Sequence, residues 1–406
     1  MSAAPTSRFQ SLSTSGRPLI DFGLQPVSNR FLAPRGHLCA PAFPLALRVD
    51  EEDGLIHLAE PFPLDELRPR FSWLTCFEPE AHLDDLVDRL VSLPGIFKES
   101  RIGAYSFKDD TTLRRLEGRG YANTWRIDPE ADLGVADPLA NVETYQLHFQ
   151  PAQAEKIRVR RGTSDIFIVR HVLEHSYDLP AFLQACKKLI RPGGYIIFEV
   201  PDCTRALELA DYTTVWEEHV FYFTPETLRS SLSAADFQID HFESVEFPFE
   251  NSLIAITRVT DKPAPAVSLA TAKAEITRAI YFADSFKKRQ ASVQNRLKKA
   301  RSELGPIAMF GAGHLSVAFL SLMEISDQIE FVVDDNPNKK GMRMPVGHLS
   351  IMGSEALYER GIRVCLLSLN PQNQPNVIKG HARFAVAGGK FASIFPGSDH
   401  ELEAVL

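Results

Sequence analysis

Apolar residues follow a two-residue spacing near the start of the chain. They alternate with polar residues over positions 45–49 and again over positions 55–60. The acidic, turn-prone residues 50–54 separate these two runs. Alternation interrupted in this way predicts a β-hairpin. Because prolines and short apolar runs fill the rest of this region, we expect residues 1–75 to form a small β-rich module.

The next part of the chain alternates between strand and helix patterns. Apolar residues recur at helical spacing over residues 82–93, which predicts an amphipathic helix. Two continuous apolar runs, at 165–170 and 195–200, are typical of buried parallel strands, and Pro201 is expected to end the second. Further short strands are expected at residues 101–107, 124–128 and 145–149. This alternation predicts a parallel sheet covered by helices on both faces.

A second α/β region follows a proline-rich linker and a long helical segment. Strand, glycine turn and helix patterns recur after residue 305. The expected boundaries are 1–75 for the β-rich module, 76–262 for the first α/β domain, 263–305 for the linker helix and 306–406 for the second α/β domain.

Composition narrows the class of protein. The 406 residues carry a net charge of −8, which argues against a protein that coats nucleic acid. No window reaches the ~18 continuous apolar residues of a membrane helix, and the first residues lack a signal-peptide core. The five cysteines are scattered without a CxxC pair, which indicates thiols in a reducing compartment. We therefore expect a cytoplasmic protein without a nucleic-acid or membrane partner.

A glycine turn opens the second α/β domain. Gly311 and Gly313 stand between a predicted strand and a predicted helix, a context that suits a bound phosphate or carboxylate. Ser316 stands where the full dinucleotide fingerprint needs glycine, while Asp334 and Asp335 fall where a ribose-binding acid would lie. Two interpretations stay open: a dinucleotide site, and a tight turn followed by solvated acids.

A histidine-bearing loop gives a more specific pattern. A buried strand leads into His171, Glu174 and His175, followed by a helix, a Lys/Arg-Pro-Gly-Gly turn and a second buried strand. On a helix, this HxxEH spacing would suit a zinc protease, but here it begins a loop, so no catalytic metal is expected. The arrangement resembles the second half of class I S-adenosylmethionine (SAM) methyltransferases. That resemblance implies a doubly wound α/β sheet of the class I methyltransferase type, with the β-rich module before it and a Rossmann-like C-terminal domain after it.

Four segments spread over the chain resemble a narrower family, the three-part C-methyltransferases that act on nucleotide-linked deoxyketo-sugars. The segments are DFGLQPVSNRFL, HVLEH to EVPD, WEEHVFYFTPETL and FVVDDNPNKKGMRMPVGHLSI. The resemblance implies a zinc-binding N-terminal module, a SAM domain and a C-terminal domain that helps enclose the sugar nucleotide. The implied partner is a small nucleotide sugar, expected to be dTDP-linked.

The sequence departs from this family at the zinc site. Where the family places metal-binding cysteines, this chain has the four acids of residues 50–53. Structural zinc prefers thiolates and imidazoles. We therefore expect no zinc, and a module that is held together by packing.

The loop expected to hold SAM departs from the family as well. The resemblance aligns residues 105–113 with the family's E-I-G-x-N-D-G-T-L segment, so that Phe107 and Thr111 replace both glycines. Glycine allows a ligand to approach the backbone closely, and Phe107 is expected to narrow the pocket for the methionyl end of SAM. The candidate cofactor-binding residues are Phe107, Asp110, Asp128 and His171. For Asp128 the alternative is a helix N-cap.

By the same resemblance, the segment around residues 213–228 holds the acid/base site. C-methylation beside a ketone needs a base for the α-proton, and histidine suits this task because its pKa lies near neutrality. His219 is the expected base, assisted by His175 and Glu218, whereas Glu217 is expected to be solvated. The candidate substrate-binding residues are Trp216, Tyr222, Gly311, Gly313, His314, Asp335, Asn336 and Lys339.

These residues favour a SAM-dependent C-methyltransferase that acts on a nucleotide-linked keto-sugar through an enolate. A first alternative is a non-catalytic or repurposed relative that binds a nucleotide sugar without SAM, because both loop glycines are replaced. A second alternative is an NAD-dependent oxidoreductase that uses the glycine turn at Gly311.

Overall fold

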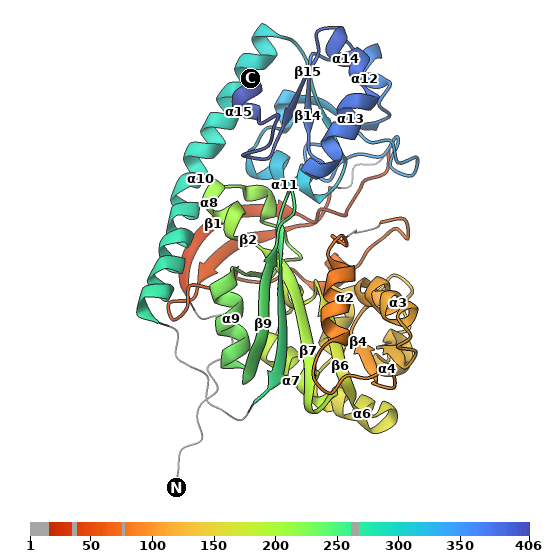
Figure 1. Cartoon of the computed structure of the whole chain (residues 1–406). Coiled ribbons are helices and arrows are strands. Elements are labelled where there is room, and N and C mark those ends of the chain that lie inside the picture. Colours follow the sequence, from red (N-terminus) through yellow and green to blue (C-terminus); the bar gives the residue numbers. More distant parts are fainter. Residues whose placement is uncertain (1–15, 35–38, 75–77, 261–267) are drawn as a thin grey trace.

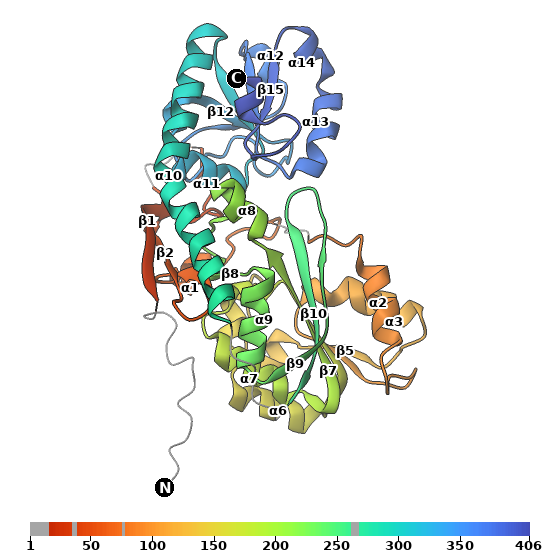
Figure 2. The same cartoon turned by 60° about the vertical axis from the view of Figure 1, so that its left-hand side comes forward.

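The chain folds into three β-sheets with covering helices (Figure 1). The computed structural model describes residues 16–34, 39–74, 78–260 and 268–406. Figures 1 and 2 show the C-terminal α/β part at one end of the molecule and the middle α/β part at the other, with strands β1 and β2 between them. No helix in the described part of the chain is both long and apolar enough to cross a membrane.

The N-terminal sheet has the strand order β1-β2-β3-β8. Its strands are β1 (Arg17–Pro26), β2 (Ala42–Val49), β3 (Ile56–Leu58) and β8 (Phe221–Tyr222). β2 and β3 pair antiparallel around residues 50–54, so the predicted hairpin is confirmed. Because β8 comes from the middle of the chain and pairs with β3, it ties the segment that carries Glu218 and His219 to the N-terminal module.

The acidic turn between β2 and β3 packs on two helices, α9 (Pro225–Ala234) and α10 (Leu269–Glu303). Asp53 Oδ1 accepts the backbone N–H of Leu55 at 3.0 Å, and its Oδ2 accepts the hydroxyl of Ser230 on α9 at 2.8 Å. Gly54, with φ +82°, lies so close to α10 that an added Cβ would come within 2.4 Å of Glu275 Cβ. Hydrogen bonds and close packing thus hold this turn, and the absence of zinc stays a prediction.

The middle sheet has the strand order β5-β4-β6-β7-β10-β9. Its strands are β4 (Ile102–Ala104), β5 (Thr124–Arg126), β6 (Ser164–Arg170), β7 (Ile190–Asp202), β9 (Phe237–Val245) and β10 (Asn251–Val259). The first four strands in this order are parallel, as predicted, but β10 pairs antiparallel with both β7 and β9. The prediction is wrong at this edge because the short connection 246–250 between β9 and β10 suits an antiparallel pair.

Residues 145–148 are helical, which contradicts the prediction of a strand over residues 145–149. They belong to α5 (Val142–Tyr145) and the 3₁₀ helix η2 (Gln146–His148). The Asn141 side chain starts α5 by accepting the backbone N–H of Thr144. Buried Val142, Tyr145 and Phe149 recur at a helical spacing that alternation with polar residues had masked.

Strand β7 also runs further than predicted. It continues through Pro201 to Asp202 and pairs there with β10. β6 pairs with β7 only up to Glu199, so proline stands where β7 has become an edge on that side. A proline is tolerated at an edge because its missing N–H has no ladder partner to satisfy.

Helices cover both faces of the middle sheet. α2 (Leu83–Val91) and α3 (Asp110–Gly118) bury apolar residues on one face, and α6 (Pro151–Arg161), α7 (Leu179–Lys188) and α9 cover the other. The shorter helices of the N-terminal and middle parts are α1 (Leu64–Leu67), η1 (Phe107–Asp109), α4 (Pro129–Leu133), η3 (Leu173–His175), α8 (Thr204–Leu209) and η4 (Tyr212–Thr214). The predicted doubly wound fold of the class I methyltransferase type is confirmed.

The C-terminal sheet is parallel throughout, in the order β13-β12-β11-β14-β15. Its strands are β11 (Ile307–Phe310), β12 (Ile329–Val333), β13 (Ile351–Met352), β14 (Val364–Leu367) and β15 (Lys390–Ser393). Its helices are α11 (His314–Leu322), η5 (Ser326–Gln328), α12 (Ala356–Glu359), η6 (Pro371–Asn373), α13 (Gln374–Gly380), α14 (Ala382–Val386) and α15 (Leu402–Val405). This is a Rossmann-like arrangement.

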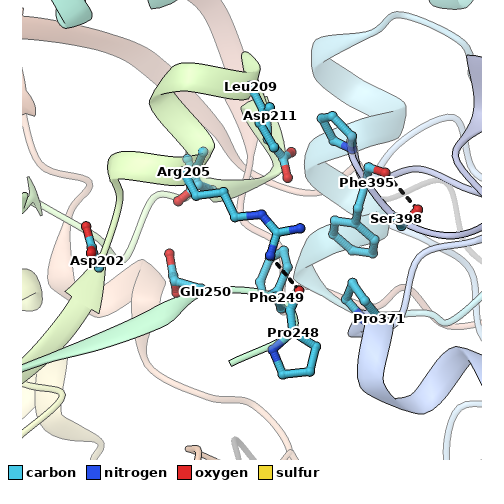
Figure 3. A pocket seen from close by; sticks show the side chains of 13 residues that line it. Asp202, Arg205, Leu209, Asp211, Pro248, Phe249, Glu250, Pro371, Phe395 and Ser398 are labelled. Carbon is cyan, nitrogen blue, oxygen red and sulfur yellow. Dashed lines mark hydrogen bonds between the residues drawn. The ribbon is translucent and has the colours of Figure 1, made fainter. Parts of the chain in front are cut away.

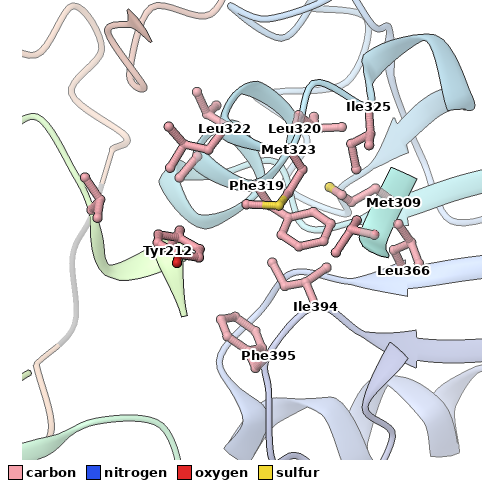
Figure 4. Close-up of a cluster of buried hydrophobic side chains, with 14 of the residues drawn as sticks. Tyr212, Met309, Phe319, Leu320, Leu322, Met323, Ile325, Leu366, Ile394 and Phe395 are labelled. Atoms are coloured by element: carbon pink, nitrogen blue, oxygen red, sulfur yellow. The ribbon is translucent and has the colours of Figure 1, made fainter. Parts of the chain in front are cut away.

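One hydrophobic core joins all three parts. Tyr212 from the middle part lies in the same cluster as Phe319 and Met323 of the C-terminal part (Figure 4). The Tyr212 hydroxyl donates to the Phe282 carbonyl on α10 at 2.6 Å. α10 has 35 residues and runs along both α/β parts (Figures 1 and 2). Shared burial of this kind fixes the parts relative to one another, and so fixes what lies between them.

Candidate active site

A cavity of about 460 Å³ lies where the three parts meet. Asn29 lines it from the N-terminal module, and His314 and Asn370 line it from the C-terminal part. The middle part contributes residues that follow β4, β6 and β7 at their carboxyl ends, where ligands of α/β sheets bind. Its volume lies within the roughly 300–1,000 Å³ that is usual for small-molecule sites. This cavity is the candidate active site.

A cavity of about 20 Å³ adjoins it toward the C-terminal part (Figure 3). Thr214, Phe249 and Glu250 line both cavities. Burial raises the pKa of Glu250 to about 8, although His171 opposes this in part. Arg205 donates from Nη1 to the Pro248 carbonyl at 2.8 Å. The space suits about one water molecule, so it extends the polar wall of the larger cavity.

Hydrogen bonds join the His175 segment to the His219 segment. The Val220 N–H donates to the Glu174 carbonyl at 2.6 Å, and His175 Nδ1 donates to the Glu218 carbonyl at 2.9 Å. The imidazole rings of His175 and His219 lie 4.9 Å apart, with an angle of 79° between their planes. The structure therefore brings the three predicted catalytic residues, His175, Glu218 and His219, into one wall of the cavity.

Glu143 completes this cluster, and the sequence did not predict it. Its Oε1 lies 3.0 Å from Nδ1 of His175. Burial is the largest single influence and favours a raised pKa for Glu143, but the interactions with His175 and Lys108 together outweigh burial and lower it. Glu143 was missed because the neighbouring residues were assigned to a strand. The helix-capping Asn141 was the signal that could have placed it correctly.

Burial sets the protonation of the expected acid and base. It lowers the pKa of His219 well below the ordinary value, and the charges of His175 and Lys108 reinforce the effect. It raises the pKa of Glu218 well above the ordinary value, and the carboxylates of Glu143 and Glu217 reinforce that effect. These shifts favour the unprotonated form of His219 and the protonated form of Glu218.

The Glu218 carboxyl group is oriented by the N-terminal module. Asn29 Nδ2 donates to Glu218 Oε1 at 3.1 Å. Within the described ranges, no hydrogen bond joins the carboxyl group of Glu218 to the imidazole of His219. Glu218 and His219 therefore face the cavity as separate groups.

Glu217 is buried, which contradicts the prediction that it is solvated. Its side chain is 4% exposed. Oε1 accepts the Ser28 N–H at 2.6 Å, and Oε2 accepts the Ser28 hydroxyl at 3.0 Å. Burial raises the pKa of Glu217 to about 7, although the bonds from Ser28 oppose this. The prediction failed because the partner lies 189 residues away in the sequence.

Trp216 forms a wall of the cavity together with His314. Their rings stack with centroids 4.2 Å apart, and both side chains line the cavity. Tyr222 lies behind this wall. It is 1% exposed, and its hydroxyl donates to the Trp216 carbonyl at 3.3 Å. The structure therefore gives Tyr222 a packing position, outside the residues that line the cavity, and its substrate role stays a prediction.

A charged network surrounds His171 at the carboxyl end of β6. Arg170 Nε donates to Glu199 Oε2 at 2.5 Å, and His171 Nε2 lies 3.1 Å from Glu199 Oε1. Burial favours a lowered pKa for His171, but Glu78, Glu174 and Glu199 outweigh burial and raise it to about 10. His171, predicted to bind the cofactor, therefore lines the cavity as a cation.

The predicted SAM loop is closed by its own hydrogen bonds. The Ser106 N–H donates to Asp109 Oδ2 at 2.8 Å, and the Lys108 N–H donates to Ser106 Oγ at 3.2 Å. These bonds form a capping box that starts η1. Phe107 lines the cavity and is 47% exposed.

The other two residues predicted to bind SAM do not line the cavity. Asp110 forms an ion pair of 3.3 Å with Arg126. Asp128 accepts the Ala131 N–H at 2.7 Å and is the N-cap of α4, as the alternative interpretation held. Whether Asp128 also binds a ribose stays a prediction.

The glycine turn of the C-terminal part uses its own N–H groups. Ala312 N–H donates to Asp334 Oδ2 at 2.9 Å, and Gly313 N–H donates to Ser316 Oγ at 3.0 Å. Lys339 Nζ lies 3.0 Å from the same Asp334 oxygen. The Asp334 carboxylate therefore lies where a bound anionic ligand would lie at this turn. Besides Tyr222, five predicted substrate-binding residues lie outside the cavity lining, and they are Gly311, Gly313, Asp335, Asn336 and Lys339.

Asn29, Glu78 and Lys108 are among the further lining residues that were not predicted. Asn29 lies within the N-terminal segment that carried the family resemblance, so the sequence did hold a signal for it. Glu78 lies in a loop, where no spacing rule points a side chain toward the site, and Lys108 lies in η1, within the segment 105–113 that the resemblance aligned with the SAM loop.

The comparisons with known families cover both α/β parts. Residues 64–241 match the family described as a methyltransferase domain, and residues 269–396 match the C-methyltransferase C-terminal domain. Over 391 residues the chain is 22% identical to the C-methyltransferase NovU of Streptomyces niveus, covering 93% of this chain and 92% of that protein. Over 138 residues it is 27% identical to a ubiquinone biosynthesis O-methyltransferase of Rhizobium etli, covering 30% of this chain and 55% of that protein.

The solved structures that resemble the chain include methyltransferases. The 1,6-didemethyltoxoflavin-N1-methyltransferase of Burkholderia thailandensis has a TM-score of 0.31 and 15% identity, covering 45% of this chain and 80% of its own. A putative methyltransferase of Bacillus halodurans has a TM-score of 0.26 and 9% identity, covering 43% and 99%. No conclusion rests on scores this low. The strand order and the matched families carry the fold assignment.

Proposed function

Because the chain is a homologue of C-methyltransferases, we propose that it transfers a methyl group from SAM to a nucleotide-linked keto-sugar. The acceptor is the carbon beside the ketone, and the nucleotide is dTDP. The observation that carries this proposal is the meeting of His219, Glu218 and the Trp216–His314 wall in one cavity. Enolate formation requires a base for the α-proton and a donor to the developing enolate oxygen, and a flat aromatic wall suits the face of a sugar ring.

The charge of the cavity fits SAM, which carries a sulfonium and an ammonium group. The side chains of Glu78, Glu143 and Glu174 line the space. Glu174 Oε2 is buried, and no hydrogen-bond partner for it lies among the described residues. The Lys108 ammonium pairs with Glu78 on this acidic surface. Phe107 and His171 are the predicted cofactor residues that line the same space.

The residues of the chain prepare the nucleophile. When bound, SAM supplies an electrophilic methyl group. The neutral imidazole of His219 takes the α-proton of the sugar, and the electron pair of that C–H bond moves onto the ketone oxygen. The protonated carboxyl group of Glu218 donates a hydrogen bond to this oxygen as negative charge develops. His175 lies beside His219 and supports it.

The other lining residues hold the substrate and exclude water. Trp216 and His314 close one side of the cavity. Asn29, Asn370 and Asn373 supply side-chain amides from the N-terminal and C-terminal parts. Amides both donate and accept hydrogen bonds, which suits sugar hydroxyls.

The alternatives differ from this proposal at identifiable groups. An NAD site at the glycine turn has to displace Asp334 and the hydroxyl of Ser316 from the N–H groups they hold, so the geometry does not favour it. A relative that no longer binds SAM keeps the sugar site but forms no S-adenosylhomocysteine (SAH).

Turnover with defined substrates tests the proposal. The protein is incubated with SAM and a panel of dTDP-linked keto-sugars, and SAH and the methylated sugar are measured by mass spectrometry. His219→Gln should abolish product, whereas His148→Gln, at an exposed histidine, should not. Binding of the sugar with neither SAM binding nor SAH formation would leave the non-catalytic alternative standing in place of the proposal.

A further inference from the structure

Lys108 is a buried lysine in the wall of the candidate active site. Its side chain is 7% exposed. Nζ lies 2.9 Å from Glu78 Oε1 and donates to the carbonyl oxygen of His171 at 2.9 Å. A buried ammonium needs such partners, because burying an unpaired charge costs several kcal/mol. All three residues line the cavity, so this ion pair borders the ligand space.

The backbone directs Lys108 to this position. Arg170 Nη1 donates to the Lys108 carbonyl at 2.9 Å, and the Arg170 N–H donates to Asp109 Oδ1 at 3.1 Å. Arg170 is fully buried and paired with Glu199. The turn after β4 is thereby fastened to the end of β6, with the Lys108 side chain toward the His171 carbonyl.

His171 presents that carbonyl from a strained backbone. Its φ is +51°, in the left-handed region that residues other than glycine seldom adopt. The His171 N–H donates to the Glu199 carbonyl at 2.8 Å. Backbone strain of this kind gathers at ligand sites. The carbonyl therefore belongs to the binding surface, although Lys108 now holds it.

The methionine end of SAM carries an ammonium group. When SAM binds at the carboxyl ends of the strands, where ligands of such sheets bind, this group needs hydrogen-bond acceptors there. Glu78 and the His171 carbonyl are acceptors of this kind. We infer that Lys108 competes from within the chain with the ammonium group of SAM, which binds only when Lys108 leaves these acceptors. Lys108 is then a specificity-determining residue that disfavours adenosine ligands with an amino-acid end. This inference rests on the proposed function.

Calorimetry with two ligands isolates this competition. SAH carries the ammonium group, whereas 5′-methylthioadenosine keeps the adenosine and lacks the amino-acid end. Lys108→Met should bind SAH at least about tenfold tighter than the unchanged protein, because the donor no longer displaces a charged hydrogen-bonding group. Its affinity for methylthioadenosine should stay within about twofold, since that ligand makes no contact with the ammonium acceptors. Lys108→Arg keeps the cation and should not show the gain in SAH affinity.

A second substitution guards against an indirect effect of Lys108→Met on folding. Adding Glu78→Gln to Lys108→Met removes the carboxylate that the freed SAH ammonium would use. The double variant should lose the gain in SAH affinity and keep its affinity for methylthioadenosine. Thermal unfolding of each variant checks that the fold is retained.

The outcomes separate this inference from the proposed function. Equal or weaker SAH binding by Lys108→Met, with methylthioadenosine binding intact, overturns the inference and leaves the proposed function standing. If Lys108→Met binds SAH and the unchanged protein does not, the inference is supported. SAM-dependent turnover by the unchanged protein is then rejected. Failure of every variant to bind either ligand overturns both.

Discussion

The indole of Trp216 lies nearly parallel to the imidazole of His314, with 4.2 Å between ring centroids and 18° between planes. Trp216 precedes β8 of the N-terminal sheet, and His314 is the first residue of α11 in the C-terminal part. Burial lowers the pKa of His314 to about 4, although Glu78 opposes this. Two uncharged rings therefore stack across a domain boundary at neutral pH, and they close the cavity on that side.

Breaking this stack should weaken both the wall and the binding of the sugar. The coupling between Trp216→Ala and His314→Ala in a double-mutant cycle should be about 1 kcal/mol in the free energy of unfolding, the usual value for an aromatic pair. KM for the sugar should rise about fivefold in Trp216→Ala, by the same free energy. Trp216→Phe keeps an aromatic face and should stay near the unchanged protein. Additive single effects would contradict a direct contribution of the stack.

Glu217 should make the stability of the protein depend on pH. Its pKa is raised from an ordinary 4.5 to about 7 in the folded chain. Protonated Glu217 therefore contributes its full share to the free energy of unfolding below the ordinary pKa. This contribution is lost as the pH rises through about 7. Glu217→Gln should remove that loss, and so raise the free energy of unfolding by about 3 kcal/mol at about pH 8 with little change at about pH 4.

Urea denaturation at the two pH values measures the effect of Glu217→Gln. Glu226→Gln, at an exposed position of α9, is the matched control and should leave the pH dependence as it is. A Glu217→Gln variant that loses stability equally at both pH values would show that the carboxyl group acts only through its bonds to Ser28.

Glu218 should define the alkaline limit of activity. Burial raises the pKa of Glu218 well above its ordinary value, and the donated hydrogen bond is lost as pH rises through that raised pKa. Turnover should therefore fall on the alkaline side. Glu218→Gln keeps an N–H donor that does not ionise, so its rate should be lower at neutral pH but lack the alkaline fall. If turnover by Glu218→Gln falls at alkaline pH as it does in the unchanged protein, another group causes the fall.

The sequence predicted the parts of the fold that local spacing determines. Buried runs such as 165–170 became strands, and alternation around residues 50–54 became a hairpin. It failed where a distant partner decides the outcome. Glu217 is buried because Ser28 reaches it across 189 positions, and no local pattern contains that contact.

The candidate site was predictable to the same extent. His175 and His219 could be placed near each other because one follows β6 and the other belongs to a segment with a family resemblance. Lys108 lies in the segment 105–113 aligned with the SAM loop, but the position of its side chain could not be predicted, since it depends on the buried Arg170 that fastens this turn. The glycine turn at Gly311 was predicted to face a ligand, but the Asp334 carboxylate already occupies it.

Proton exchange at the sugar tests the central claim most directly, because it reports enolate formation without methyl transfer. A dTDP-linked keto-sugar is incubated with the protein and SAH in D₂O, and deuterium uptake beside the ketone is followed by NMR. The unchanged protein and His148→Gln should catalyse exchange, and His219→Gln should slow it by at least about a hundredfold while still binding the sugar. Equal exchange by His219→Gln, or none by an unchanged protein that binds the sugar, would contradict the account.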